Sequence, residues 1–138
     1  MKRDPHKTAR CVLQYDNEYL LAVHSSFWAK KNQRWGLPGG RIERGETARE
    51  AVQRELEEEL ELYHTNYIEV APYRYKGAKH MVFGATIPQR ITEYDEGELL
   101  DLRWFTLDQL RELERTNQLH AGYELSAIKQ YIELPKPV

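Results

Sequence analysis

The sequence has little that would divide, crosslink or anchor its 138 residues. Its one cysteine, Cys11, has no partner within the chain and falls in the apolar stretch Cys11-Val12-Leu13. A free thiol in such a stretch usually behaves as a small hydrophobe, which fits a cytoplasmic location. No internal repeat and no linker rich in proline, glycine or serine separates folding units, so we expect a single domain over residues 1–138.

Long hydrophobic runs and an excess of basic charge are also missing. The apolar run that follows the basic N-terminus is broken by Gln14, Asp16, Asn17 and Glu18, which excludes a secretory or membrane-spanning segment. The net charge of -2 gives no basic footprint for duplex nucleic acid. We therefore expect neither a membrane nor duplex nucleic acid as a partner, and the balance suits a protein that binds an anion through a cation.

The hydrophobic pattern mixes strands and helices. Residues 79–87 place Met81, Phe83, Ala85 and Ile87 on one face, which is typical of a half-buried strand. The polar turn Asp16-Asn17-Glu18 predicts a hairpin, and Lys76-Gly77 predicts a second turn. We expect strands over residues 8–15, 19–24, 35–37, 67–75, 79–87 and 100–105, and helices over residues 47 to about 62, 107–113 and 123–132.

The helix expected from residue 47 carries two sets of glutamates. Thr47 and Glu50 have the spacing of a capping box, which predicts where the helix begins. At about 100° per residue, one arc of the helix holds three of the later glutamates, and nearly the opposite side holds the other three. The first set is Glu55, Glu58 and Glu59, and the second is Glu50, Glu57 and Glu61.

The two sets have different interpretations. We interpret the second set as ordinary solvated charge. The first set shares its arc with the small residues Ala48 and Ala51, so this side of the helix can approach another backbone. Like charges at this spacing repel each other, and a divalent metal ion would remove that cost. Carboxylate oxygens near a phosphate are the ligands that Mg²⁺ prefers.

A glycine turn and this helix together form a recognisable motif. Leu37-Pro38-Gly39-Gly40-Arg41 has paired glycines that allow a sharp turn and a close approach to a ligand. Gly40, then Glu46, then Arg54-Glu55-Leu56-Glu57-Glu58-Glu59-Leu60-Glu61-Leu62 resembles the motif of the Nudix hydrolases, the family of MutT-like enzymes. The one departure is Glu61, where the family has glycine. Glycine normally supplies a left-handed cap there, so we expect the helix to run slightly longer or to fray.

The resemblance implies a fold and roles for the matching residues. The fold would be α/β, an α/β/α sandwich with a mixed β-sheet. Glu58 and Glu59 would be metal ligands, Glu55 a further ligand or the group that orients the attacking water, and the Gly39 carbonyl a backbone ligand. The metal would be Mg²⁺, with Mn²⁺ as a substitute. Glu46 and Arg54 would form a supporting ion pair.

Other site residues are less firmly indicated. Glu98 is our choice among the acids Glu93, Asp95, Glu96, Glu98 and Asp101 for an additional carboxylate ligand, although most acids in such a segment are simply solvated. We expect Arg41 to bind substrate phosphates, in preference to the other basic candidates Lys30, Lys31 and Arg34. Trp28, beside Phe27, would stack on a base, with packing on the core as the alternative. Trp35 and Trp104 are assigned to the core, and the histidines have no metal-ligand spacing.

The predicted activity is hydrolysis of a phosphoanhydride bond in a nucleoside diphosphate linked to another moiety. The chain is short, which favours a nucleoside triphosphate, while ADP-ribose, a nucleotide sugar and a dinucleoside polyphosphate stay open. The alternative is a ligand-sensing or interaction domain without turnover. Such a protein would be expected to have lost metal ligands, and Glu55, Glu58 and Glu59 are all present. A homodimer is compatible with the sequence, which does not select an oligomeric state.

Overall fold

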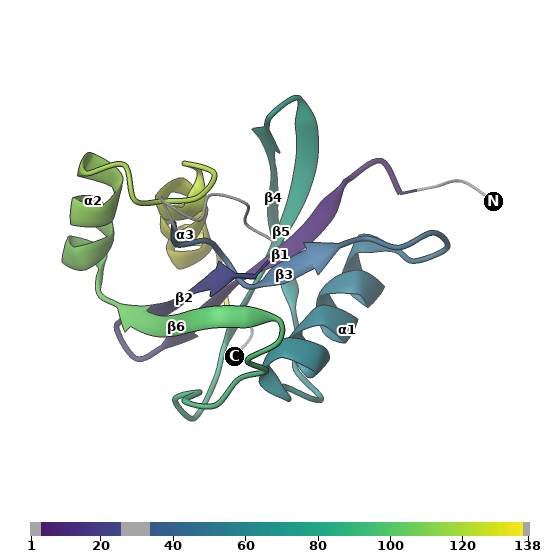
Figure 1. The fold of residues 1–138 in the computed structure, drawn as a ribbon, viewed down its shortest axis with the longest axis horizontal. Coiled ribbons are helices and arrows are strands. Elements are labelled where there is room, and N and C mark those ends of the chain that lie inside the picture. The colour runs from purple at the N-terminus through teal and green to yellow at the C-terminus, as the bar shows by residue number, and fades with distance from the viewer. Residues whose placement is uncertain (1–3, 26–33, 137–138) are drawn as a thin grey trace.

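The computed structural model describes residues 4–25 and 34–136. Figure 1 shows the six strands and three helices found in those residues. In chain order they are β1 (Thr8–Tyr15), β2 (Glu18–His24), β3 (Gly39–Arg41), α1 (Ala48–Leu60), β4 (Ile68–Tyr75), β5 (Ala78–Thr86), β6 (Leu99–Phe105), α2 (Leu107–Arg115) and α3 (Glu124–Glu133).

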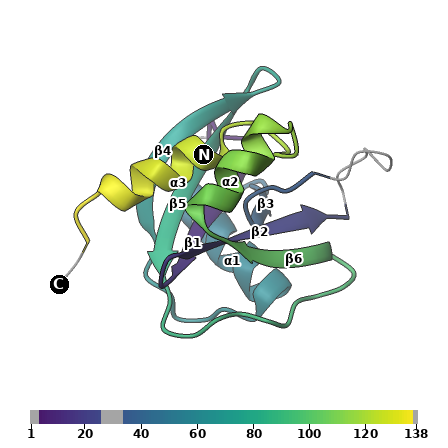
Figure 2. The same cartoon turned by 90° about the vertical axis from the view of Figure 1, so that its left-hand side faces the viewer.

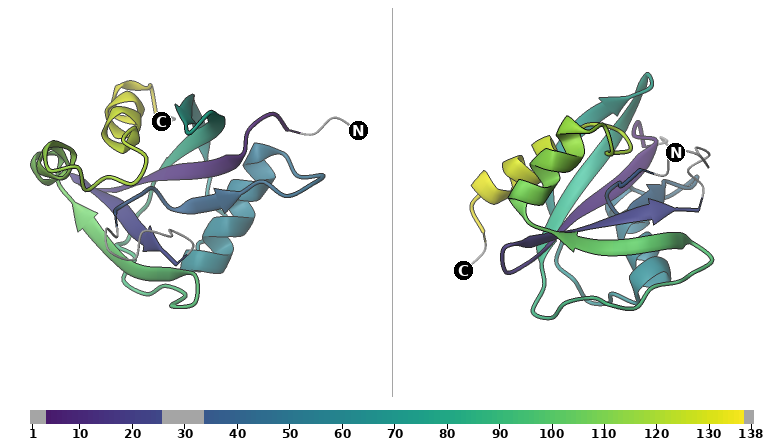
Figure 3. Two further views of the ribbon diagram at one scale, coloured as in Figure 1. Left: turned by 45° about the horizontal axis from the view of Figure 1, so that its top comes forward. Right: turned by 60° about the vertical axis from the view of Figure 1, so that its left-hand side comes forward.

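The strands form one mixed sheet in the order β4-β5-β1-β2-β6, with β3 paired to β1. β1 and β5 are parallel, and the other pairs are antiparallel. Helix α1 covers one face, while α2 and α3 cover the other (Figure 3). Figure 2, which looks onto the second face, shows α2 and α3 next to each other. The predicted α/β/α sandwich with a mixed sheet is therefore confirmed.

Each face of the sheet has its own hydrophobic core. Phe83 of β5 points toward α1, where it packs with Leu56, and the neighbouring Val82 points to the core under α2 and α3. β5 is thus buried on both faces rather than half-buried as its alternation predicted, because helices cover both sides. Within the described residues, no helix is both long enough and apolar enough to cross a bilayer.

The sheet divides beside β1, and this division makes room for the site. β1 pairs with β2 only next to their turn, at Gln14 and Tyr15, whereas its other half pairs with β3. The expected strand at 35–37 is absent; Gly36 makes only an isolated bridge to Ala22. The expected sharp turn at the two glycines is instead strand β3. Gly39 keeps a backbone that favours glycine, with φ +129°.

Both ends of α1 are fixed by local contacts. At its start the Thr47 hydroxyl accepts the Glu50 N–H, and the Glu50 carboxylate accepts the Thr47 N–H. The helix ends at Leu60, and Glu61 takes the left-handed conformation with φ 52° and ψ 36°. The Glu61 N–H still donates to the Glu57 carbonyl, at 3.0 Å. The expectation of a longer or frayed helix was therefore wrong, because Glu61 adopts the conformation that glycine normally supplies.

The pairing of β2 with β6 contains one irregularity, which changes which leucine of β6 is buried. The register changes between Val23 and His24, so Leu99 pairs with His24. Leu99 is fully buried as a result, while Leu100 is 49% exposed. In the strand predicted over residues 100–105, Leu102 and Trp104 pack on the core, whereas Leu100 does not.

Candidate active site

The glutamates of α1 differ in burial as well as in direction. Glu59 is 2% exposed and lies among the core residues. Glu55 is partly buried, whereas Glu58 lies exposed at the edge of the same arc. The opposite set, Glu50, Glu57 and Glu61, is exposed, which agrees with its interpretation as solvated charge.

Glu59 is held between β2 and β3. Its Oε1 accepts the Gly39 N–H at 3.1 Å, and its Oε2 lies 3.5 Å from His24 Nδ1. Burial, and then the neighbouring charge of Glu55, raises the pKa of Glu59 to about 9. Burial, and then the positive charge of Arg10, lowers the pKa of His24 to about 3. The imidazole is therefore neutral at physiological pH, and this buried contact is not an ion pair.

Glu55 lies directly against the second glycine of β3. A Cβ atom at Gly40 would lie 2.5 Å from the Glu55 carboxylate, so only glycine leaves room for it. A Cβ atom at Gly39 would lie 2.2 Å from the Ala9 carbonyl oxygen. Burial raises the pKa of Glu55, even though the adjacent Arg54 acts to lower it. The close backbone approach predicted for the glycine pair is present, and a helix carboxylate is what approaches.

Arg54 ties the loop before α1 to the helix. Its Nε and Nη2 donate to the two oxygens of Glu46, at 2.7 and 2.9 Å, which is the predicted ion pair in a two-pronged form. Nη2 also donates to the Arg41 carbonyl at 3.0 Å. Nη1 lies 3.1 Å from Glu55 and 3.4 Å from Glu58. One guanidinium thus fixes the loop, the end of β3 and two of the predicted ligands.

The segment before β6 brings Glu98 close to Glu59. The Asp95 N–H donates to the Glu59 carbonyl at 2.9 Å, and the Ser25 N–H donates to the Glu98 carbonyl at 3.0 Å. The Glu98 side chain is exposed, yet its charge contributes to the raised pKa of Glu59.

Arg10, which the sequence did not single out, reaches the same place from β1. Its Nη1 donates to the Gly39 carbonyl at 2.8 Å and lies 3.4 Å from His24 Nε2. The carbonyl predicted to be a metal ligand therefore faces a guanidinium. No local pattern marks Arg10 or His24, because their proximity to Glu59 depends on how the strands pair.

The donor set suits a hard cation. The raised pKa of Glu59 reflects a buried carboxyl group beside the negative charges of Glu55 and Glu98. Oxygen donors of this kind match Mg²⁺. In the part of the chain that the structure describes, no three acidic, histidine or cysteine side chains converge closely enough to hold an ion as they stand. Arg54 draws Glu55 and Glu58 to itself, and Glu59 faces Gly39 and His24.

A cavity of about 520 Å³ lies beside Arg10. Arg10 and Arg41 line it together with Lys7 and Lys76, so it is rich in positive charge. Arg41, predicted to bind phosphates, is exposed there. Trp28, predicted to stack on a base, lies outside the described residues, as do Phe27, Lys30 and Lys31.

The same cavity has a wall of aromatic rings that sequence reasoning missed. The rings of Tyr75 and His120 lie 5.3 Å apart, and those of His80 and Tyr123 lie 6.2 Å apart with 27° between their planes. The carboxylate of buried Glu124 accepts the N–H groups of residues 121 and 122, at 2.9 and 2.8 Å, which fixes the loop that carries two of these rings. Aromatic rings and cations in one cavity suit a ligand that combines a planar ring with negative charge.

Comparison with known proteins identifies the family of the chain. The model of the NUDIX domain family matches residues 4–124, which is most of the chain. The chain belongs to the Nudix family. A curated relative, the NAD-capped RNA hydrolase NudC of Haemophilus influenzae (strain PittGG), is 31% identical over 117 residues, covering 79% of this chain and 44% of that protein. The enzyme of that name from Pectobacterium atrosepticum is 31% identical over 110 residues, covering 76% and 41%. This Nudix chain thus spans less than half the length of the curated relatives it matches.

Solved structures support the fold. A MutT NUDIX hydrolase from Burkholderia pseudomallei superimposes with a TM-score of 0.71 at 24% identity, over 92% of this chain and 98% of that one. The NUDIX domain of Shewanella oneidensis NrtR, solved with ADP ribose, gives 0.72 at 21% identity, over 96% and 89%. Within the Nudix motif, the departure at Glu61 leaves the helix end in place, because the backbone there is left-handed as glycine would make it.

Proposed function

We propose that this Nudix chain is a magnesium-dependent hydrolase that cleaves a phosphoanhydride bond in a nucleoside diphosphate linked to another moiety. One observation carries the proposal: the carboxyl groups of Glu55 and Glu59 are packed against the two glycines of β3, with Glu98 within electrostatic reach. Negative charge on neighbouring carboxyl groups is costly in a buried place unless a cation compensates it.

The residues that would hold the metal are Glu55, Glu58, Glu59, the Gly39 carbonyl and Glu98. When bound, Mg²⁺ neutralises the diphosphate and lowers the pKa of a coordinated water, and Mn²⁺ can replace it. In the structure Arg54 contacts Glu55 and Glu58. For these two glutamates to bind the metal ion instead, only their exposed or partly exposed side chains have to rotate. The oxygen-only donor set supports this choice of cation.

The chain's own residues prepare the site for the substrate. Arg54 orients Glu55, and Gly40 gives it room. His24 and the Gly39 N–H orient Glu59. Arg10 and Arg41 bind phosphate oxygens at the edge of the cavity, and the base stacks on the rings of Tyr75 and Tyr123. Trp28 keeps its predicted role as a further stacking residue.

The substrate is a nucleotide, with a nucleoside triphosphate and ADP-ribose-like compounds as the first candidates. The second candidate is supported by a similar domain, which was solved with ADP ribose. The curated relatives are named as hydrolases of NAD-capped RNA, so a nucleotide cap also belongs in the set. We place the protein in the cytoplasm, where the buried free thiol of Cys11 stays reduced.

The test is release of phosphate, pyrophosphate or mononucleotide from a panel of these nucleotides, with Mg²⁺ and without it. We expect turnover of at least one compound that depends on the metal. Glu59→Gln should lower the rate by orders of magnitude, whereas the exposed Glu57→Gln on the opposite side of α1 should change it little. A wild-type protein that binds nucleotides but turns over none of them would refute the enzyme and favour a sensing domain.

A further inference from the structure

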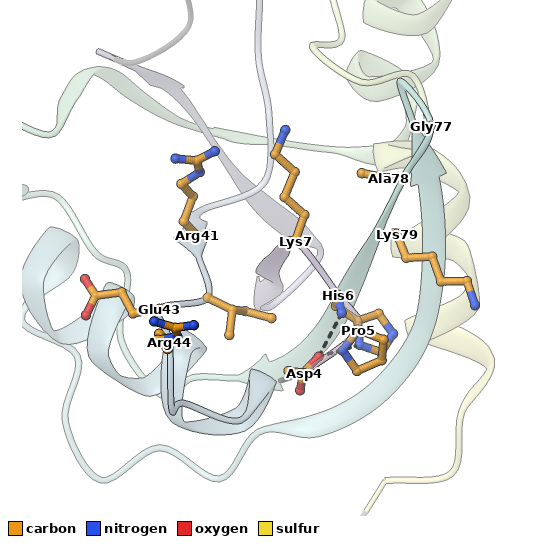
Figure 4. A pocket seen from close by; sticks show the side chains of 11 residues that line it. Asp4, Pro5, His6, Lys7, Arg41, Glu43, Arg44, Gly77, Ala78 and Lys79 are labelled. Carbon is orange, nitrogen blue, oxygen red and sulfur yellow. Dashed lines mark hydrogen bonds and ion pairs between the residues drawn. The ribbon is translucent and has the colours of Figure 1, made fainter. Parts of the chain in front are cut away.

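A second and larger cavity, of about 830 Å³, lies next to the one that contains the aromatic rings. Its walls come from the N-terminal segment 4–7, the loop that follows β3 and the turn between β4 and β5 (Figure 4). The Lys7 N–H donates to the Lys79 carbonyl at 2.8 Å, and the Ile42 N–H donates to the Lys7 carbonyl at 3.1 Å. The segment is thus fastened on both sides, and the cavity is a built part of the fold.

The side chains of this basic cavity leave positive charge without a counter-charge. Four of its lining side chains are basic and two are acidic: Lys7, Arg41, Arg44 and Lys79 against Asp4 and Glu43. Asp4 is already occupied, because one carboxylate oxygen accepts the Ala48 N–H at 2.9 Å and the other accepts the His6 N–H at 2.9 Å. Within the described residues, no carboxylate forms an ion pair with any of the four cations.

Lys7 and Arg41 line both cavities, so the two meet at these side chains. In Figure 4, Arg41 from β3 and Lys7 from the N-terminal segment extend in the same direction, and Lys79 extends away from them. The aromatic cavity in turn contains Arg10, which donates to the Gly39 carbonyl beside Glu59. The predicted metal ligands, the rings and the basic cavity therefore follow one another across the surface.

We propose that the basic cavity binds a second phosphate, carried on the ribose of the nucleotide whose diphosphate lies at the candidate active site. The inference rests on the proposed function. With the base on the rings and the 5′-diphosphate at the glutamates, the 2′ and 3′ oxygens are the remaining points of attachment on the ribose. A phosphate there meets Lys7 and Arg41 first and Arg44 further in. The phosphate comes either from a monoester on a dinucleotide or from the phosphodiester that begins an RNA chain.

Pairs of substrates that differ only by this phosphate test the proposal. Reduced NADP and reduced NAD differ at the 2′ oxygen, coenzyme A and its dephospho form differ at the 3′ oxygen, and a 5′-triphosphorylated dinucleotide extends ATP by a 3′ phosphodiester. One or two charge-assisted hydrogen bonds tighten binding about tenfold. We expect the phosphorylated member of at least one pair to have a kcat/KM about tenfold higher, mainly through KM. Preference in the first two pairs identifies a monoester, and preference in the third identifies an RNA end.

Variants locate the effect. Arg44→Gln and Lys79→Gln belong to the basic cavity alone and should bring the ratio of kcat/KM within the preferred pair toward one. Lys129→Gln, an exposed lysine on α3, is the matched control and should leave the ratio unchanged. Turnover with a ratio near one for every pair, or a preference that survives both substitutions, would overturn the inference and leave the proposed function standing.

A protein without any turnover would overturn the proposed function instead. The basic cavity is then tested by equilibrium binding of adenosine 3′,5′-bisphosphate and of adenosine 5′-monophosphate without metal. Tighter binding of the bisphosphate that is lost in Arg44→Gln supports the inference, and equal binding of the two compounds refutes it.

Discussion

Glu61 closes α1 in a conformation that costs free energy, and Glu61→Gly should remove that cost. An L-residue in the left-handed region costs about 1–2 kcal/mol relative to glycine. A carboxylate at a helix C-terminus adds about 0.3 kcal/mol when exposed, as Glu61 is. Glycine gives back part of the gain, about 0.4–1 kcal/mol, because it makes the unfolded chain more flexible. The net expectation is about 1 kcal/mol of added stability, or roughly 3–4 °C in Tm for a chain of this length.

Urea denaturation at several temperatures measures this change, and Glu61→Gln is the matched control. The glutamine variant removes the charge but keeps the left-handed side chain, so it should gain only a few tenths of a kcal/mol. A glycine variant no more stable than the wild type would refute the assignment of the strained backbone. Equal gains from both variants would show that charge, and not conformation, is what Glu61 costs.

Three further substitutions separate site from scaffold. Gly40→Ala places a methyl group 2.5 Å from the Glu55 carboxylate. Because the flexible Glu55 side chain can move away, we expect Tm to change little and kcat to fall about 100-fold. Unchanged kinetics would contradict this. Gly84→Ala places its methyl group 2.2 Å from the buried ring of Tyr131, so thermal unfolding should show a loss of about 1–3 kcal/mol. Arg54→Lys removes the planar two-pronged contact with the loop, and steady-state kinetics should show about a tenfold loss; full activity would mean that one charge suffices there.

Local patterns predicted the elements whose cause is local. The capping box at Thr47 and Glu50 defined the start of α1 because both partners lie within four residues. The hairpin of β1 and β2 followed from two apolar stretches joined by the polar turn Asp16-Asn17-Glu18. β3 could not be predicted in this way, because a Gly-Gly-Arg strand has no strand propensity of its own and exists through its pairing with β1.

In the candidate site, too, the features with a local cause were predictable and those that depend on strand pairing were not. The two faces of α1 follow from helical geometry, so the exposure of Glu57 was predictable from its spacing, whereas Glu58 and Glu59 share one arc and only packing buries Glu59. The approach of Arg10 and His24 to Glu59 joins residues from separate elements and depends on sheet topology. The rings of the aromatic cavity likewise come from a hairpin and a distant loop, so no single segment of the sequence predicts that they lie together.

The parallel pairing of β1 with β5 has a consequence for how the protein folds. Thr8 lies opposite His80, and β2, β3, α1 and β4 all lie between the two strands in the chain. During synthesis β1, β2, β3 and α1 emerge before the strand that completes the centre of the sheet. Non-local contacts of this kind slow folding, because a long loop must be closed before it is stabilised. The glutamates of α1 are therefore made before β5, and the apolar side of their helix stays partly uncovered until that strand, which contributes no predicted metal ligand, completes the sheet.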